Sequence, residues 1–334
     1  MTNKLFPWHE KPLAEVESAL EADRLTHALL IEGPEGVGKL GLAFAIARRV
    51  LGLAGDAPDP LAPPVHADLL WITREEGERG LKKQIGIDQV RAACRELAMT
   101  SYAGGWKVAV IAPADRLTPA AANSLLKTLE EPAPETLLIL VRTRRDTLPA
   151  TIASRCQRLL VNPPAPEQAL EWLQANARGK ARWDRLLAMA GGAPLLAIRL
   201  REEGFETLDE TLDRGLREVV AGVADPVELA ARTGDREPAD VLRWLDFWVG
   251  ELIRLGAAGP RPELDPKRAE ALQKVLQRIP LPRLFRYLDE LRAASTRLDG
   301  ALNAQLVMEN LLTPWADALE PTRGASEQGV LADR

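Results

Sequence analysis

The chain has 334 residues, 46% hydrophobic and 27% charged, which is typical of a folded globular protein and not of a disordered chain. Its 43 lysines and arginines against 48 aspartates and glutamates give a formal net charge of −5, which excludes a globally basic nucleic-acid binder. No apolar run is long enough to span a bilayer, and the first ten residues lack a secretory signal pattern. The two cysteines, Cys94 and Cys156, indicate neither a disulfide framework nor a four-thiolate zinc site, and we expect a cytoplasmic protein.

Strand-like and helix-like segments alternate over the first 160 residues. Short apolar runs bounded by glycine or proline predict strands, and longer runs with helical periodicity predict helices. The expected strands are 28–31, 68–73, 107–112 and 137–141, and the expected helices are 40–51, 87–98 and 119–129. This alternation predicts a parallel sheet with helices on both faces.

After Val161 the pattern becomes helical. Prolines crowd the segment 162–166, which marks a domain boundary, and no convincing strand follows it. The fold class is therefore α/β and then all-α, in three parts: a 1–162 α/β domain, a 163–205 small helical domain and a 206–334 helical C-terminal domain. In the last part Trp244 and Trp248 share the apolar face of one expected helix, so we interpret both as core residues and not as ligand platforms.

A glycine-rich segment lies between the first expected strand and the first expected helix. Residues 33–39, GPEGVGK, match the first seven positions of the phosphate loop G-x-x-x-x-G-K-[ST]. In such a loop the glycines let backbone N–H groups face the phosphates, and the lysine reaches the terminal phosphoryl oxygens. The candidate nucleotide-binding residues are Gly33, Gly36, Gly38 and Lys39.

Two departures remove oxygen ligands that an ATP-hydrolysing site needs. The eighth loop position holds Leu40, where a serine or threonine hydroxyl would bind Mg²⁺. The strand that should supply a metal-binding Asp and a catalytic Glu ends instead at Ala112 and Pro113, and Asp115 follows two residues later. We therefore expect no Mg²⁺-dependent hydrolysis and no required cofactor. Binding of ATP without hydrolysis stays open, as does a loop retained as architecture alone.

Two longer segments carry a family resemblance. Residues 123–132, NSLLKTLEEP, resemble the helix N-x-L-L-K-x-L-E-E-P of the clamp-loader branch of AAA+ proteins. Residues 148–156, LPATIASRC, resemble the S-R-C box of the same family, and residues 87–91 are similar to a third family element. With the glycine-rich loop, these segments extend the resemblance over most of residues 25–160.

The resemblance implies an AAA+ domain, a helical lid at 163–205 and a helical collar at 206–334 that joins the subunits. An ATP-hydrolysing member would have an arginine near Pro194 besides the groups missing at Leu40, Ala112 and Pro113. Because this chain lacks them all and retains its S-R-C box, it resembles a member that does not hydrolyse ATP. Such a member donates an arginine finger in trans, which implies that role for Arg155, with Ser154 and Cys156 framing its turn.

The resemblance also implies the partners. They are the ATP-hydrolysing gamma/tau subunits and the clamp-opening delta subunit of the bacterial DNA polymerase III clamp loader and, indirectly, the sliding clamp and primed DNA. The chain would thus be no enzyme on its own but part of a hetero-oligomer in the polymerase holoenzyme. Related subunits often carry a four-cysteine zinc module where residues 52–68 of this chain hold no cysteine, so we expect no metal.

Other interpretations of the same residues remain open. One alternative is an AAA+ ATPase with unusual Mg²⁺ ligands, and another is a stand-alone interaction module with a relic nucleotide fold. Arg155 would then make an intramolecular salt bridge or lie free on the surface. One further group is a basic stretch that either faces DNA phosphates or a neighbour's nucleotide, or is a solvated face: Arg142, Arg144, Arg145, Arg155 and Arg158. Another group is either a subunit contact or ordinary helix-surface charge: Lys127, Glu130 and Glu131.

Overall fold

The computed structural model describes residues 5–53, 63–77, 80–81, 84–143, 148–233, 236–260, 265–297 and 304–317. The chain divides into two compact units, Met1–Leu200 and Arg201–Arg334. The domain limits expected at 162 and 205 stay predictions, and residues 54–62 of the cysteine-free segment lie outside the described part. None of the described helices is both long enough and apolar enough to cross a membrane.

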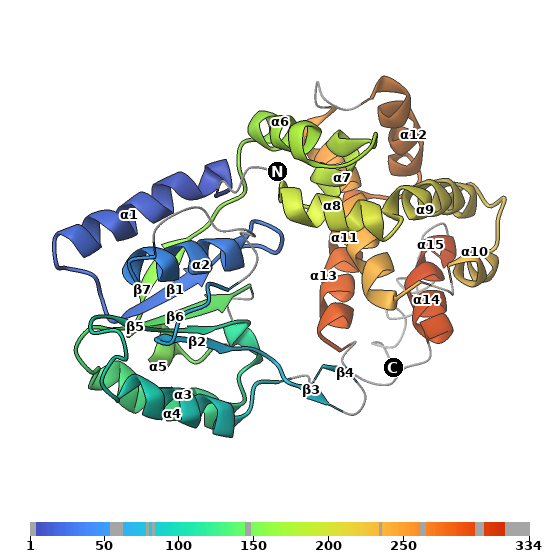
Figure 1. Cartoon of the computed structure of the whole chain (residues 1–334). Coiled ribbons are helices and arrows are strands. Elements are labelled where there is room, and N and C mark those ends of the chain that lie inside the picture. Colours follow the sequence, from blue (N-terminus) through green and yellow to red (C-terminus); the bar gives the residue numbers. More distant parts are fainter. Residues whose placement is uncertain are drawn as a thin grey trace, which may run out of the picture. The chain divides into compact units, whose positions relative to one another are not determined.

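A five-stranded parallel sheet forms the centre of the first unit (Figure 1). Its strands are β1 (Ala28–Glu32), β2 (Leu69–Ile72), β5 (Lys107–Ile111), β6 (Thr136–Arg142) and β7 (Gln157–Leu160), in the order β2-β5-β6-β1-β7. A separate two-stranded sheet joins β3 (Glu76–Gly77) and β4 (Gly80–Leu81). Every residue of β1, β5 and β6 is buried, which explains why all but the end residues of these strands are apolar.

Helices cover both faces of the sheet, as the sequence predicts (Figure 1). One face carries α1 (Glu10–Glu21) and α2 (Lys39–Val50), and the other carries α3 (Ile87–Leu97), α4 (Pro119–Glu130) and α5 (Ala150–Ala153). Alternate strand residues such as Leu30, Ile111 and Leu140 form one core with α3 and α4. The remaining described elements up to Glu202 are two 3-10 turns and three helices. They are η1 (Pro7–His9), η2 (Ala114–Arg116), α6 (Pro166–Asn176), α7 (Trp183–Met189) and α8 (Pro194–Glu202).

Helix α4 shows how local sequence sets these boundaries. The Thr118 hydroxyl accepts the Ala121 N–H at 3.1 Å, and Pro119 occupies the first helical position, where its missing N–H costs nothing. The helix ends at Glu130, two residues before Pro132. The family-like segment NSLLKTLEEP therefore ends with its carboxylates at the carboxyl end of a helix.

The described part of the second unit is helical. Its helices are α9 (Phe205–Val220), α10 (Pro226–Arg232), α11 (Pro238–Ala258), α12 (Pro266–Leu276), α13 (Leu281–Arg297), α14 (Ala304–Leu312) and α15 (Pro314–Asp317). Trp244 and Trp248 are fully buried on α11, with ring centroids 5.6 Å apart. Their indole N–H groups donate to the carboxylates of Asp209 and Asp213, each at 2.8 Å. The prediction that both tryptophans are core residues is confirmed.

Candidate functional site

The glycine-rich loop joins β1 to α2 at the carboxyl edge of the sheet, where parallel α/β sheets bind ligands. Gly36 and Gly38 both have φ near +80°, a conformation that other residues adopt only with strain. A Cβ atom on Gly33 would lie 2.2 Å from the backbone oxygen of Val161. The glycines of the predicted phosphate loop are thus required by the path of the backbone.

Helix α8 contacts this loop in three places. The Leu195 N–H donates to the Gly36 oxygen at 3.0 Å, and a Cβ on Gly36 would lie 2.3 Å from the Cβ of Leu196. The Arg199 guanidinium forms a 2.8 Å ion pair with Glu35. Because side chains and backbone of α8 contact the loop directly, protein atoms cover this side of it.

Residues ahead of α1 cover the loop at Gly38. A Cβ on Gly38 would lie 2.7 Å from the Phe6 ring. Trp8 Nε1 donates to the Val37 oxygen at 2.8 Å, and His9 Nε2 lies 2.8 Å from the same oxygen. Since a carbonyl oxygen only accepts, Nε2 of His9 carries the proton. The Phe6 and Trp8 rings stack at 5.1 Å, so an aromatic cluster closes over the loop.

His9 makes the loop region sensitive to acid. The side chain is fully buried, and burial lowers its pKa to about 4, against the weaker opposing effect of its hydrogen bond to Val37. The folded-state pKa lies below the unfolded value of about 6.5, so this contribution to stability is complete above pH 6.5. It is lost as the pH falls towards 4, because the unfolded chain then binds the additional proton.

Replacing His9 by glutamine is expected to remove this pH dependence, because an amide N–H can still donate to Val37 but does not titrate. Between pH 6.5 and 4 the wild type should lose up to about 1.4 kcal/mol per pH unit relative to His9→Gln. Urea unfolding of both full-length proteins at several pH values measures the difference. A difference that stays constant over this range would contradict the assignment.

Lys39 is turned inward in this loop. Its Nζ donates to the Pro34 oxygen at 2.6 Å, and the residue is 7% exposed. Burial lowers the pKa of its amine to about 8, although the charges of Glu35 and Asp115 favour the protonated form. Asp115 therefore lies near the lysine, and its Oδ1 is buried without a hydrogen-bond partner among the described residues. The amine is bound to the loop's own backbone.

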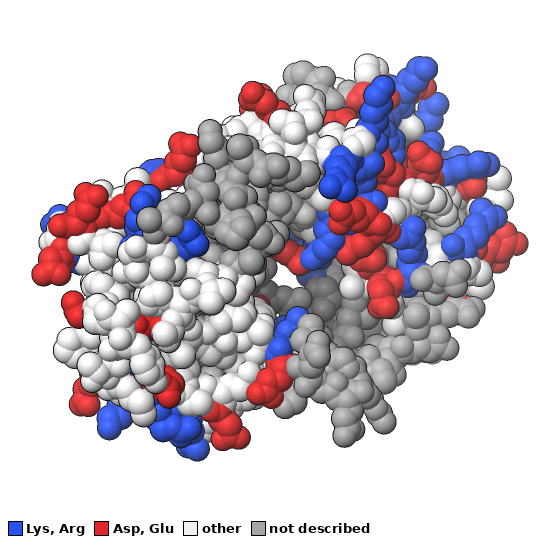
Figure 2. Space-filling model, in the orientation of Figure 1, with Lys and Arg blue, Asp and Glu red and all other residues white. Residues whose placement is uncertain are grey.

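The structure contradicts a surface role for Arg142. Its guanidinium pairs with Glu32 at the carboxyl edge of the sheet, with Nη2 to Oε2 at 2.6 Å and Nε to Oε2 at 3.0 Å. The two side chains are 4% and 7% exposed, so Arg142 neither faces DNA nor belongs to a solvated face. Arg158 is exposed on β7, while residues 144–147 lie outside the described part. On the face shown in Figure 2, positive and negative side chains are interspersed along the rim of the first unit.

The S-R-C segment lies at the opposite, amino edge of the sheet, between α5 and β7. All three side chains donate hydrogen bonds to the end of α5. Ser154 Oγ and Arg155 Nη1 bond the Thr151 oxygen at 3.2 and 2.8 Å, and Cys156 Sγ bonds the Ile152 oxygen at 3.3 Å. Carbonyl groups at a helix end lack partners within the helix, so these bonds fix the turn. Burial raises the pKa of the Cys156 thiol to about 11, which makes it a poor nucleophile.

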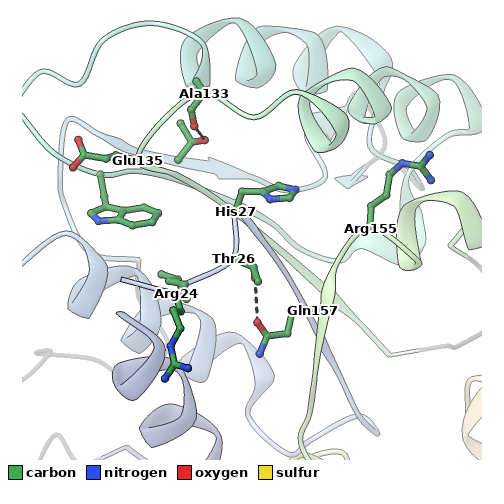
Figure 3. A pocket seen from close by; sticks show the side chains of 10 residues that line it. Arg24, Thr26, His27, Ala133, Glu135, Arg155 and Gln157 are labelled. Carbon is green, nitrogen blue, oxygen red and sulfur yellow. Dashed lines mark hydrogen bonds between the residues drawn. The ribbon is translucent and has the colours of Figure 1, made fainter. Parts of the chain in front are cut away.

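Arg155 is exposed and forms an ion pair with Glu130, Nη2 to Oε1, at 2.8 Å. The intramolecular salt bridge considered from the sequence is therefore present. Beside it lies an open hollow of about 450 Å³. Its lining includes Arg24, Thr26, His27, Glu135, Arg155 and Gln157. In Figure 3 the arginines Arg24 and Arg155 extend from opposite sides of this hollow, with the His27 ring between them.

The structure thus separates the predicted site residues into two groups. Gly33, Gly36, Gly38 and Lys39 meet at the carboxyl edge of the sheet, and Arg155 lies at the amino edge. No sequence pattern indicates the covering contacts from the N-terminal aromatic residues and α8, because they join distant segments. Among the described residues, no group of histidine, cysteine and carboxylate side chains has the arrangement of a metal site.

Comparison with known proteins identifies the family. Residues 8–165 match the family model described as "DNA polymerase III, delta subunit". The chain is 31% identical to DNA polymerase III subunit delta' of Escherichia coli, over 72% of this chain and 73% of that protein. This chain belongs to the delta prime family. The delta prime protein of Pseudomonas aeruginosa is 29% identical over 95% of this chain and 99% of its own length.

The family assignment confirms the clamp-loader resemblance of the motifs and makes this delta prime chain a DNA replication protein. Solved structures that are similar include a gamma subunit-related protein of Thermotoga maritima, at 19% identity, with a TM-score of 0.47 over 92% of this chain and all of that one. Another is the RuvB branch-migration motor of the same organism, at 18% identity, with a TM-score of 0.39. The alignment covers 92% of this chain and 85% of the RuvB chain.

Proposed function

We propose that this delta prime chain is a clamp-loader subunit that does not hydrolyse ATP and that donates Arg155 in trans to the nucleotide site of an adjacent gamma/tau subunit. The observation that carries the proposal is the placement of Arg155. It is exposed at one edge of the sheet, on a turn that three side-chain hydrogen bonds hold in place. A fixed turn with an exposed guanidinium is what a donor to another chain requires.

The chemistry of arginine supports this role. During ATP hydrolysis, negative charge spreads over the γ-phosphoryl oxygens in the transition state. A guanidinium is planar, permanently charged and able to bind two oxygens at once. Supplied in trans, such a residue is worth roughly 10³–10⁵ in rate. Arg155 has this chemistry, and its side chain is 38% exposed.

The chain's own loop supports the absence of hydrolysis. Leu40 has no oxygen for Mg²⁺, and Ala112 and Pro113 have neither a metal ligand nor a base. The Lys39 amine is bound to Pro34, and protein groups pack on Gly36 and on Gly38. These features argue against the alternative of an ATPase with unusual Mg²⁺ ligands, and they favour a loop retained as architecture.

The proposed assembly follows from this role. Gamma/tau and delta subunits are the direct partners, and the sliding clamp and primed DNA are contacted through the complex. The helical second unit would act as the collar that joins subunits by burying apolar helix faces. No cofactor is required, no membrane is involved, and the site of action is the cytoplasm with the rest of the replication machinery.

The isolated chain is expected to show no ATP turnover and no thermal stabilisation by Mg·ATP. A ligand present at 100 times its Kd would raise the free energy of unfolding by about 2.7 kcal/mol, which shifts Tm by several degrees. A thermal scan with and without millimolar Mg·ATP, with an active gamma/tau subunit as the positive control, measures binding. Turnover by the purified chain would instead support the ATPase alternative, and a monomer that ignores gamma/tau would support the stand-alone module.

The decisive experiment on the donor role reconstitutes gamma/tau, delta and this chain, and measures the ATP turnover that DNA and the clamp stimulate. It compares the wild type with Arg155→Ala after assembly of both complexes has been verified by size-exclusion chromatography.

A further inference from the structure

Glu130 and Arg155 come from different elements and meet at the amino edge of the sheet. Glu130 is the last residue of α4, and its Oε1 lies 2.8 Å from Nη2 of Arg155. The second anchor of the guanidinium is the Thr151 oxygen, 2.8 Å from Nη1. The guanidinium is therefore held at both terminal nitrogens, by a carboxylate from one helix and a carbonyl from another.

We propose that Glu130 is a positioning residue for Arg155, an inference that rests on the proposed donor role. A guanidinium has five N–H donors. The two contacts use one donor on each terminal nitrogen, so three remain for the oxygens of a phosphoryl group. Glu130 thus orients the arginine before a neighbouring site is engaged, and less rotamer freedom of the long side chain is lost at that moment.

The position of Glu130 argues against a role in stabilising its own helix. A carboxylate at the carboxyl end of a helix meets the negative end of the helix dipole, which is unfavourable. The side chain is also 51% exposed, so it contributes little to the core. Glutamine has nearly the same helix propensity as glutamate. Glu130→Gln should therefore preserve the fold and change only the contact with Arg155.

The test measures DNA- and clamp-stimulated ATP turnover by the reconstituted complex with Glu130→Gln. We expect the single-turnover rate at the nucleotide site that Arg155 completes to fall about threefold to fivefold, the effect of losing about 0.7–1 kcal/mol from an exposed ion pair. KM for ATP and assembly should not change, because Arg155 would act on the transition state and not on nucleotide binding. The matched control is Glu17→Gln on α1, which removes a partly exposed carboxylate that pairs with the exposed Arg49 at 2.5 Å. The control should leave turnover unchanged.

A double-mutant cycle separates positioning from a structural effect. If Glu130 acts through Arg155, then Glu130→Gln should have no effect in the Arg155→Ala background. Equal losses in both backgrounds, or weakened assembly, would overturn the positioning role. If Arg155→Ala lowers turnover while Glu130→Gln does not, the positioning role fails and the donor role stands. If neither change lowers turnover, both proposals fail.

Discussion

Arg155→Ala is expected to abolish most of the ATP turnover at the one nucleotide site that this chain completes, while the complex still assembles. The loss at that site should approach 10³-fold, because the transition-state charge would no longer be neutralised. Single-turnover measurement separates the loss of rate at this site from hydrolysis at the sites that other subunits complete. Since the side chain is exposed, its removal should leave the stability of the chain nearly unchanged.

Arg155→Lys supplies the matched comparison. Lysine keeps the positive charge but has no planar pair of donors, so it should restore only a small part of the lost rate. A complex that assembles with Arg155→Ala and turns over normally would show that the arginine is structural. Its function would then be limited to the ion pair with Glu130 and the hydrogen bond to Thr151.

Among the proposed substitutions, Arg142→Met is expected to lower the free energy of unfolding the most. The variant leaves the Glu32 carboxylate buried without its partner at the carboxyl edge of the sheet. Removing one member of a buried ion pair typically costs about 3–5 kcal/mol, because the remaining charge is neither solvated nor paired. Chemical unfolding of the full-length chain measures this loss.

The double variant Glu32→Leu with Arg142→Met is the control for this experiment. It replaces both charges by apolar groups, and most of the stability should return. If Arg142→Met alone costs less than about 1 kcal/mol, the stability of the sheet edge does not depend on this pair. The expected difference in the free energy of unfolding between the single and the double variant distinguishes the effect of an unpaired charge from a simple loss of packing.

Much of the first unit could be predicted because its central strands are buried on both faces. The runs at β1, β5 and β6 have few polar residues, and they stand out from the helical segments between them. The edge strand β7 was not predicted, since only Leu159 of its four residues is buried. Helix α1 was missed for a similar reason, with only Pro12, Leu13 and Val16 buried.

The candidate site could likewise be predicted only in part. The loop glycines and Arg155 follow local motifs, so their placement could be anticipated from spacing. The contacts of His9 and Leu196 with the loop, and of Glu130 with Arg155, join segments that only the fold brings together. The sequence does not reveal the partner of Arg142, because Glu32 lies 110 residues away in the chain and only the pairing of β1 with β6 brings the two together.

The phosphate loop and Arg155 leave neighbouring parallel strands at opposite ends. β1 pairs with β7 from Leu29 beside Gln157 to Glu32 beside Leu160, so this paired stretch alone separates the two groups by about 10 Å along the sheet. A chain built this way cannot bring its arginine to its own loop. The proposed role therefore requires contact with another subunit, in which this chain supplies the donor face and the partner supplies the receiving face.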